Sequence, residues 1–173
     1  MELKNITISQ LQFSDILEFE AILQQLIVDI ETKTPIKKRV REIVGCMHGQ
    51  KDSHGRMRKY LVAKDLDGRV FGCIAHVEPE SDLVNFFKLS KDENIEMLNF
   101  FVKKEYQGNG IGKKLFNEVV DLARKLKKNN MVWHSGPRFK PTWKFYDRLA
   151  DQSGFIKGKY NGIDAGVWRK KII

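Results

Sequence analysis

The chain has 173 residues, a length that suits one domain with a substantial buried core. Hydrophobic residues make up 42% of it and charged residues 31%, which is typical of a soluble globular protein. The two cysteines have no metal-ligand spacing, no apolar run reaches membrane-spanning length, and the first residues do not resemble a signal peptide. We therefore expect a cytoplasmic protein with reduced thiols, no metal and no membrane contact.

The formal net charge of the chain is +9, which favours anionic partners. Nucleic acid and an acidic protein are both candidates on charge alone. The basic residues are scattered along the sequence, so the charge does not choose between them.

The first half of the chain predicts a strand, two helices and a hairpin. Asn5 to Ser9 alternates apolar and polar residues, as a strand does, and apolar residues from Ile16 to Ile30 recur at helical spacing. Ser14 is the expected N-cap of that helix. The remaining predictions are a basic helix, a polar loop and two hairpin strands: Ile36 to Cys46, Gly49 to Arg58, Tyr60 to Ala63, and Val70 to Val77.

Pro79 to Asp92 breaks the periodic pattern and is predicted to be a linker. It contains Phe86 and Phe87, which either fold under as a satellite core or line a substrate mouth.

The second half predicts a central strand followed by a helix and a parallel strand. Ile95 to Val102 is apolar on both faces, as expected for a strand buried on both sides. The later elements are two helices and three strands: Lys113 to Lys128, Met131 to Trp133, Pro141 to Leu149, Gly154 to Tyr160, and Ala165 to Lys170. Asn161 and Gly162 between the last two strands indicate a hairpin turn.

Three glycines lie in the turn between the central strand and its helix, in the pattern Q-x-x-G-x-G formed by Gln107, Gly110 and Gly112. Glycine lets bare backbone N–H groups approach a ligand, and the helix N-terminus adds unpaired donors and a positive dipole. The turn therefore predicts a phosphate site. The spacing fits neither the dinucleotide fingerprint G-x-G-x-x-G nor the Walker loop.

A strand ending in an apolar pair, Q-x-x-G-x-G and an amphipathic helix together resemble the pyrophosphate-binding segment of the GNAT N-acetyltransferases. The resemblance is strongest over Glu96 to Phe155, and the flanking elements agree in order. It implies an α/β (α+β) GNAT fold over residues 1–173, with a mixed central sheet in which two splayed parallel strands are flanked by helices. It also implies acetyl-coenzyme A as cosubstrate, whose phosphates are a further anionic partner for the basic chain.

The resemblance implies a role for each coenzyme-binding residue. The backbone of the strand end would bind the pantetheine arm and the thioester oxygen, and the turn would bind the pyrophosphate. The residues concerned are Phe100, Phe101 and Val102 in the strand, and Gln107, Gly108, Asn109, Gly110, Ile111, Gly112 and Lys113 in the turn.

Phe145-Tyr146 followed by Gly154-Phe155 resembles the family segment whose tyrosine faces the coenzyme sulfur. The intervening stretch is longer here than usual, and Phe139 and Thr142 replace the asparagine and alanine often found before that tyrosine.

An alkylamine has a pKa of about 10.4, so nearly all of it is protonated at pH 7. Acetyl transfer to the amine therefore needs a base that removes a proton. Glu96 is the one carboxylate inside the central strand and stands six positions before Val102, where some protein-acetylating members of the family carry a catalytic glutamate. The alternative interpretation is that Glu96 is a solvent-exposed glutamate at the end of the strand. Tyr146 is the candidate acid for the leaving thiolate, and its alternative is a half-buried core tyrosine. Asn99 and His134 either touch the acceptor amine or make structural hydrogen bonds.

The resulting hypothesis is direct acetyl transfer from acetyl-coenzyme A to an amine. The alternative is a non-catalytic GNAT-like module that senses acyl-coenzyme A or binds nucleic acid. Nucleic acid is the less favoured partner, because the aromatic residues mostly occupy apolar periodic positions instead of interleaving with basic ones. Small amines, antibiotics, polyamines, peptide N-termini and lysine all stay open as acceptors, and the sequence carries no signal for the oligomeric state.

Overall fold

A computed structural model describes residues 5–29 and 31–172, so that Ile30, the last residue of the predicted apolar stripe, lies outside the described part. Its helices and strands, in chain order, are β1 (Thr7–Gln10), α1 (Asp15–Leu26), α2 (Lys37–Met47), β2 (Lys59–Lys64), β3 (Val70–Val77), α3 (Ser81–Phe87), β4 (Asn94–Val102), α4 (Ile111–Lys125), β5 (Asn130–Ser135), α5 (Trp143–Asp147), β6 (Gln152–Tyr160) and β7 (Ile163–Lys171). Two 3₁₀ helices cover Lys104–Tyr106 and Pro137–Thr142.

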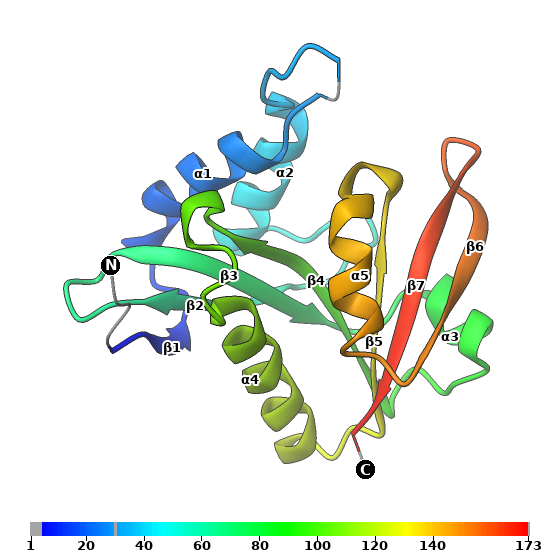
Figure 1. The fold of residues 1–173 in the computed structure, drawn as a ribbon. Helices are drawn as coiled ribbons and strands as arrows, with labels where there is room; N and C mark the ends of the chain where they lie inside the picture. Colours follow the sequence, from blue (N-terminus) through cyan, green and yellow to red (C-terminus); the bar gives the residue numbers. More distant parts are fainter. Residues whose placement is uncertain (1–4, 30, 173) are drawn as a thin grey trace. The chain divides into compact units, whose positions relative to one another are not determined.

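The strands form a mixed sheet in the order β1-β2-β3-β4-β5-β7-β6 (Figure 1). β4 and β5 are parallel, with Asn94–Glu96 paired to residues 130–132, and the neighbouring β5–β7 pair is antiparallel. This confirms the predicted mixed sheet with its parallel pair flanked by helices. The chain divides into two compact units, Met1–Val77 with Asn99–Val119 and Glu78–Leu98 with Val120–Ile173. Strand β4 supplies residues to both units.

The first unit is built on the antiparallel strands β1, β2 and β3. Every residue of β3 is buried, and α1 buries an apolar stripe at helical spacing that includes Ile16, Phe19 and Leu23. Ser14 occupies the N-cap position of α1, as predicted, but its side chain makes no capping hydrogen bond. Its own backbone is already helical, because the preceding residues form a turn in which the Asp15 N–H donates to the Gln12 carbonyl.

The second unit contains strands β5, β7 and β6 with helices on both faces of the sheet. Leu83 and Phe87 of α3 pack on Val132 of β5 and Val167 of β7. The next residues along these strands, Trp133 and Trp168, stack on each other and face α5 instead. Because successive side chains of a strand point to opposite faces, α3 and α5 cover opposite faces of this part of the sheet.

Helix α3 occupies part of the predicted linker, so that prediction was wrong for Ser81–Phe87. Seven residues are too few to show a helical period, and the helix is held by tertiary packing. Phe87 belongs to its buried core, as one of the two sequence interpretations expected, whereas Phe86 is 39% exposed and places its ring against Gly154.

Several other boundaries differ from the predictions, and two of them show how the local backbone sets the end of an element. Helix α4 ends at Lys125, before the predicted Lys128, because Lys127 adopts a left-handed conformation and the Lys128 N–H donates back to the Ala123 carbonyl. The helix predicted from Pro141 begins at Trp143, after a 3₁₀ helix. The hairpin predicted at Asn161 is confirmed, with positive φ there and at the following glycine.

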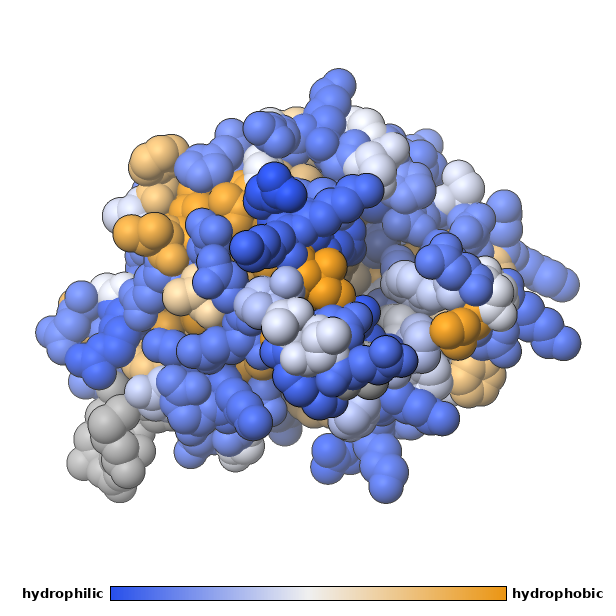
Figure 2. All heavy atoms as spheres, turned by 90° about the horizontal axis from the view of Figure 1, so that it is seen from above, coloured by the Kyte–Doolittle hydropathy of each residue, from blue (hydrophilic) through white to orange (hydrophobic). Residues whose placement is uncertain are grey.

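Hydrophilic residues cover most of the face seen in Figure 2, and hydrophobic residues are confined to limited patches. Among the described helices, none has both the length and the apolar character needed to cross a membrane.

His76 in β3 generates a prediction about pH and stability. Burial, with the nearby Lys59 charge, lowers the pKa of His76 from 6.5 to about 4. Between these two pH values the unfolded chain binds a proton at His76 that the folded chain does not, so acidification favours unfolding. From pH 7 to pH 5, His76 should cost about 2 kcal/mol in the free energy of unfolding.

Urea unfolding at the two pH values measures this loss in wild type, His76→Gln and the exposed-site control His48→Gln. The loss should be smaller in His76→Gln by about that amount and unchanged in the control. An equal loss in His76→Gln and wild type would contradict the assignment.

Candidate active site

The glycine turn in the first unit has the geometry of an anion cradle. Gly108 and Gly110 have φ values of +82° and +79°, and a Cβ at either would meet no atom within 4 Å. A hydrogen bond ties the turn to the end of strand β4, because Gln107 Nε2 donates to the Val102 carbonyl at 2.9 Å. Asn109 Nδ2 donates to the carbonyls of Tyr106 and Gln107 at 3.2 and 3.3 Å. The polar side chains of the turn thus hold its shape while its glycine surface stays open.

Helix α4 begins directly after this turn, at Ile111, whose side chain is 1% exposed and anchors the helix start. The first N–H groups of an α-helix have no partner within the helix, and the helix dipole is positive at this end. Gly112 and Lys113 lie in the first turn, where their N–H groups and the lysine ammonium suit a diphosphate. The residues present therefore fit the pyrophosphate of a coenzyme A molecule.

Asn99, in strand β4, has a left-handed φ of +47°. Its side-chain oxygen accepts hydrogen bonds from Arg58 Nη1 at 2.7 Å and from the Tyr60 hydroxyl at 3.1 Å. These contacts correspond to the structural alternative for Asn99, and its contact with an acceptor stays a prediction.

Arg58 is held in turn by Asp52, which also pairs with Arg56 at 2.9 Å inside the loop predicted as polar. Burial raises the pKa of Asp52, but hydrogen bonds from the backbone and side chain of Arg56 outweigh this effect and lower it to about 2. This buried network was not predicted, because its charges resemble those of a solvated loop in the sequence.

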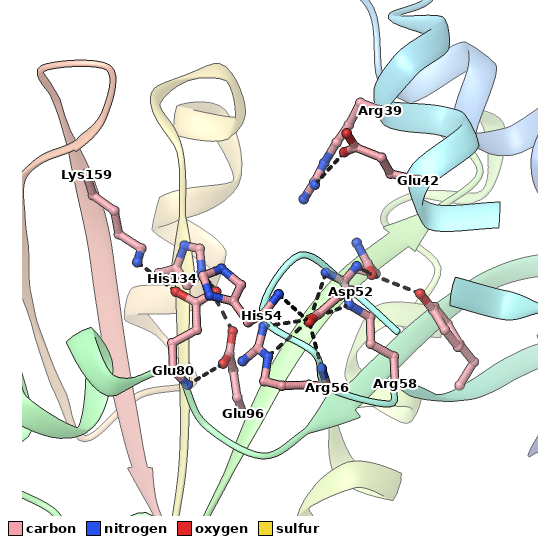
Figure 3. Close-up of polar contacts among 12 residues, drawn as sticks. Arg39, Glu42, Asp52, His54, Arg56, Arg58, Glu80, Glu96, His134 and Lys159 are labelled. Carbon is pink, nitrogen blue, oxygen red and sulfur yellow. Dashed lines mark hydrogen bonds and ion pairs between the residues drawn. The ribbon is translucent and has the colours of Figure 1, made fainter. Parts of the chain in front are cut away.

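Glu96 lies in the second unit and is 0% exposed. Its Oε2 accepts a hydrogen bond from the Glu80 backbone N–H at 2.9 Å, and its Oε1 lies 3.6 Å from His134 Nε2 (Figure 3). The alternative of a strand-end glutamate in solvent was therefore wrong, since strand β4 begins at Asn94 and its first residues are covered. A buried carboxylate beside a histidine is a common arrangement for proton transfer.

Glu80 and Lys159 complete this group. Lys159 Nζ lies 2.7 Å from Glu80 Oε2 and 3.0 Å from Asp82 Oδ2. Burial raises the pKa of Glu80, but hydrogen bonds with His134 and Lys159 outweigh this and hold it well below its usual range. Burial lowers the pKa of Lys159, but its two carboxylate partners outweigh this and raise it. Both groups therefore stay charged at neutral pH.

Ligand atoms of Glu80, Glu96 and His134 lie within 4.8 Å of one another, the spacing of a possible metal site. The Lys159 ammonium already binds Glu80, so a metal ion would have to displace a charged partner. An ammonium–carboxylate pair fits the donor set of this group better than a metal ion does.

Tyr146 lies on the opposite face of the sheet, with its ring 6.0 Å from that of Trp133 and 5.0 Å from that of Trp168. The side chain is 9% exposed. Burial raises the pKa of Tyr146 to about 12, against a smaller opposing effect of a hydrogen bond with Thr142. The hydroxyl is therefore neutral and carries its proton at physiological pH, and its acid role stays a prediction.

The alternation of side chains explains why the two predicted catalytic residues lie on different faces. Glu96 pairs in register with Val132, which faces α3, and His134 follows two residues later on the same face. Trp133 points the other way, toward Tyr146. The sequence predicted Glu96, His134 and Tyr146 but missed Glu80 and Lys159, which come from distant segments without a motif.

A model of the acetyltransferase (GNAT) family matches residues 23–150. The chain belongs to this family. No curated protein sequence matches this GNAT chain significantly.

Solved structures share the GNAT fold over nearly the whole chain. An acetyltransferase from Streptococcus agalactiae 2603 is 18% identical with a TM-score of 0.69, and the match covers 98% of this chain and 99% of that one. A spermidine N-acetyltransferase chimera from Vibrio cholerae and hSSAT is 14% identical with a TM-score of 0.68, covering 98% and 96%. The ribosomal-protein-S18-alanine N-acetyltransferase from Escherichia coli is 16% identical with a TM-score of 0.63, covering 96% and 94%. Identities this low show a common fold.

The glycine turn of this GNAT domain can be tested with a matched pair of substitutions. Gly110 and Gly68, in the β2–β3 turn, have φ values of +79° and +81°, and a Cβ added at either position would meet no atom within 4 Å. Alanine at either position should therefore cost a similar backbone strain of about 1–2 kcal/mol. Gly110→Ala should weaken acetyl-coenzyme A binding about tenfold or more in calorimetry.

Gly68→Ala is the control for strain and should bind as wild type does. Equal affinities of the two folded variants would place the coenzyme site elsewhere.

Proposed function

We propose that this GNAT domain transfers an acetyl group from acetyl-coenzyme A directly to a primary amine. The observation that carries the proposal is the fully buried Glu96 carboxylate beside His134, in a family member whose glycine turn fits a coenzyme pyrophosphate. The coenzyme supplies the activated acetyl group. Binding is assigned to residues 107–113 and to the backbone of residues 100–102, and proton transfer is assigned to Glu96 and Tyr146.

The proton balance defines what the two catalytic residues must do. A protonated amine loses two protons when it becomes an amide, and one of them ends on the coenzyme thiol. Glu96 accepts the first proton, which frees the nitrogen lone pair to attack the thioester carbonyl. The carbon–sulfur bond then breaks, and the thiolate leaves with the bonding electrons.

Tyr146 is proposed to pass the second proton from nitrogen to sulfur. A thiol has a pKa of about 8.5, so a tyrosine with a pKa of about 12 would not protonate the thiolate unless it received another proton at the same time. It can donate to sulfur while it receives a proton from the acylated nitrogen, which is far more acidic than tyrosine at that stage. The raised pKa of Tyr146 thus favours transfer through the hydroxyl over a stable tyrosinate.

Direct transfer is favoured over an acyl-enzyme because the cysteines are poor nucleophiles. Cys46 and Cys73 are both free and buried, and burial raises the pKa of the Cys73 thiol well above its usual value. Two reduced thiols also agree with the proposed cytoplasmic location.

The acceptor is proposed to be a cationic amine. Glu80 and Asp82 lie at the start of α3, and Glu96 lies on the same face of the sheet. The described contacts of these three carboxylates include one ammonium group, that of Lys159, so negative charge exceeds positive charge in this group. Excess negative charge attracts an alkylammonium ion. Two of the similar structures are named for spermidine and for an alanine of ribosomal protein S18, and both of these acceptors carry an amine.

A thiol-release assay with acetyl-coenzyme A and a panel of polyamines, lysine peptides and peptides with free N-termini tests the function. We expect thiol release that depends on both substrates, with an acetylated amine of matching mass. Coenzyme binding without turnover on any amine would indicate the acyl-coenzyme A sensor instead. Tight, strongly salt-dependent binding to nucleic acid without coenzyme binding would favour the other alternative.

Replacing Glu96 with glutamine keeps the side-chain shape and removes the base. The rate of transfer should fall about 10²–10⁴-fold while coenzyme affinity is unchanged. The acidic limb of the pH–rate profile should also flatten. Glu93→Gln is the matched control, because Glu93 is exposed just before the same strand. A Glu96→Gln rate close to that of the control would remove Glu96 as the base.

Replacing Tyr146 with phenylalanine keeps the packing against the tryptophans and removes the hydroxyl. We expect a rate loss of about 10²-fold or more. The loss should shrink with acetyl thioesters of more acidic thiols, since these leave without help from an acid. An equal loss for all thioesters, or a rate within about threefold of wild type, would exclude the acid role.

A further inference from the structure

His134 connects the buried Glu96 carboxylate with a residue at the surface. Its Nε2 lies 3.6 Å from Glu96 Oε1 and 3.7 Å from Glu80 Oε1. Its Nδ1 lies 2.8 Å from the Tyr160 hydroxyl, within hydrogen-bond distance. The exposed fraction rises along this series, from 0% for Glu96 through 16% for the His134 side chain to 36% for Tyr160. Figure 3 shows His134 among Glu80, Glu96 and Lys159.

A buried base must release the proton that it accepts before the next turnover. Glu96 has no exposed surface through which it could give this proton directly to bulk water. Glu80 is a poor recipient because Lys159 binds its other oxygen at 2.7 Å. His134 is the remaining titratable neighbour that the described contacts place beside Glu96, and imidazole can accept at one nitrogen while it donates from the other.

We propose that His134 and Tyr160 form a proton exit that carries the amine proton from Glu96 to solvent. This inference rests on the proposed acetyl transfer. In the tautomer that carries its proton on Nδ1, His134 accepts the proton from Glu96 at Nε2 and gives the Nδ1 proton to the Tyr160 oxygen as that hydroxyl releases its own proton to water. The imidazole then carries its proton on Nε2, where it faces Glu80. Rotation of the hydroxyl and return of the imidazole to its starting tautomer reset the path. One proton leaves per amide formed, and no other reactant is consumed.

Charged groups around His134 set the conditions for this path. Glu80 and Glu96 face its Nε2, Tyr160 faces its Nδ1, and Lys159 with Asp82 neutralises part of the Glu80 charge. Glu80 thereby serves as a positioning residue for the imidazole. The path requires an imidazole that can accept a proton at one nitrogen while it donates from the other.

Tyr160→Phe and His134→Gln test the exit by steady-state kinetics, with His48→Gln as the control for loss of a histidine. In both test variants kcat should fall roughly 10- to 100-fold, less than for a direct acid or base because water can replace part of the path. KM for the amine and coenzyme affinity should not change, so the loss should appear in kcat alone. Tyr160→Phe removes one hydroxyl near the surface, so it keeps the test open if His134→Gln folds poorly.

His134→Ala adds a test that separates proton transfer from a structural role, because a purely structural histidine should not be replaced by a small base in solution. Added imidazole should restore turnover in proportion to its neutral form, whereas pyrrole, which has the same ring size but no basic nitrogen, should not. A wild-type kcat in both Tyr160→Phe and His134→Gln would overturn the proton exit and leave the proposed function intact. Absence of acetyl transfer by wild type to every amine of the panel would overturn the proposed function and the exit with it.

Discussion

Glu96 is a carboxylate with no exposed surface, and its burial constrains the second unit of the chain. Removing an ionised carboxylate from water is costly unless hydrogen bonds and charges offset the loss. The Glu80 N–H supplies one such bond, which fixes the chain where it enters α3. Glu80 is itself held by Lys159 from the far end of β6. Strand β4, the start of α3 and the end of β6 are thus linked through Glu96 and Glu80. A strand with a purely structural role would not need a buried carboxylate at this position.

The pleat of strands β5 and β7 gives this unit two faces of different chemistry. Val132 and Val167 form an apolar layer under α3, and the charged group lies on the same side. The other face is aromatic, with the Trp168 indole donating a hydrogen bond to Asp147 of α5 at 2.7 Å. An acid and a base for one reaction must not neutralise each other, and separation by the sheet prevents direct contact between Glu96 and Tyr146. Under the proposed mechanism, Glu96 takes the first proton of the amine from one face, and Tyr146 passes the second proton from nitrogen to sulfur from the other.

Local patterns in the sequence were sufficient for most of the fold. Strand β3 was predicted at its observed bounds, and the glycine turn before α4 was recognised from its spacing. Helix α3 was missed because tertiary contacts, and no periodic pattern, stabilise its two turns. Ser14 stands at the predicted N-cap position of α1, but its side chain makes no capping hydrogen bond because its own backbone is already helical. Long-range charge pairs such as Lys159 with Glu80, 79 residues apart, leave no local signal at all.

The most direct test of the central claim is a crystal structure with a bisubstrate analogue, in which an acetyl linker joins the coenzyme A sulfur to an amine found active in the panel. The account predicts the sulfur within hydrogen-bond distance of the Tyr146 hydroxyl. It predicts the amine nitrogen within reach of Glu96, directly or through one water molecule. An analogue bound with its sulfur away from the Tyr146 hydroxyl, or with its nitrogen out of reach of Glu96, would contradict it.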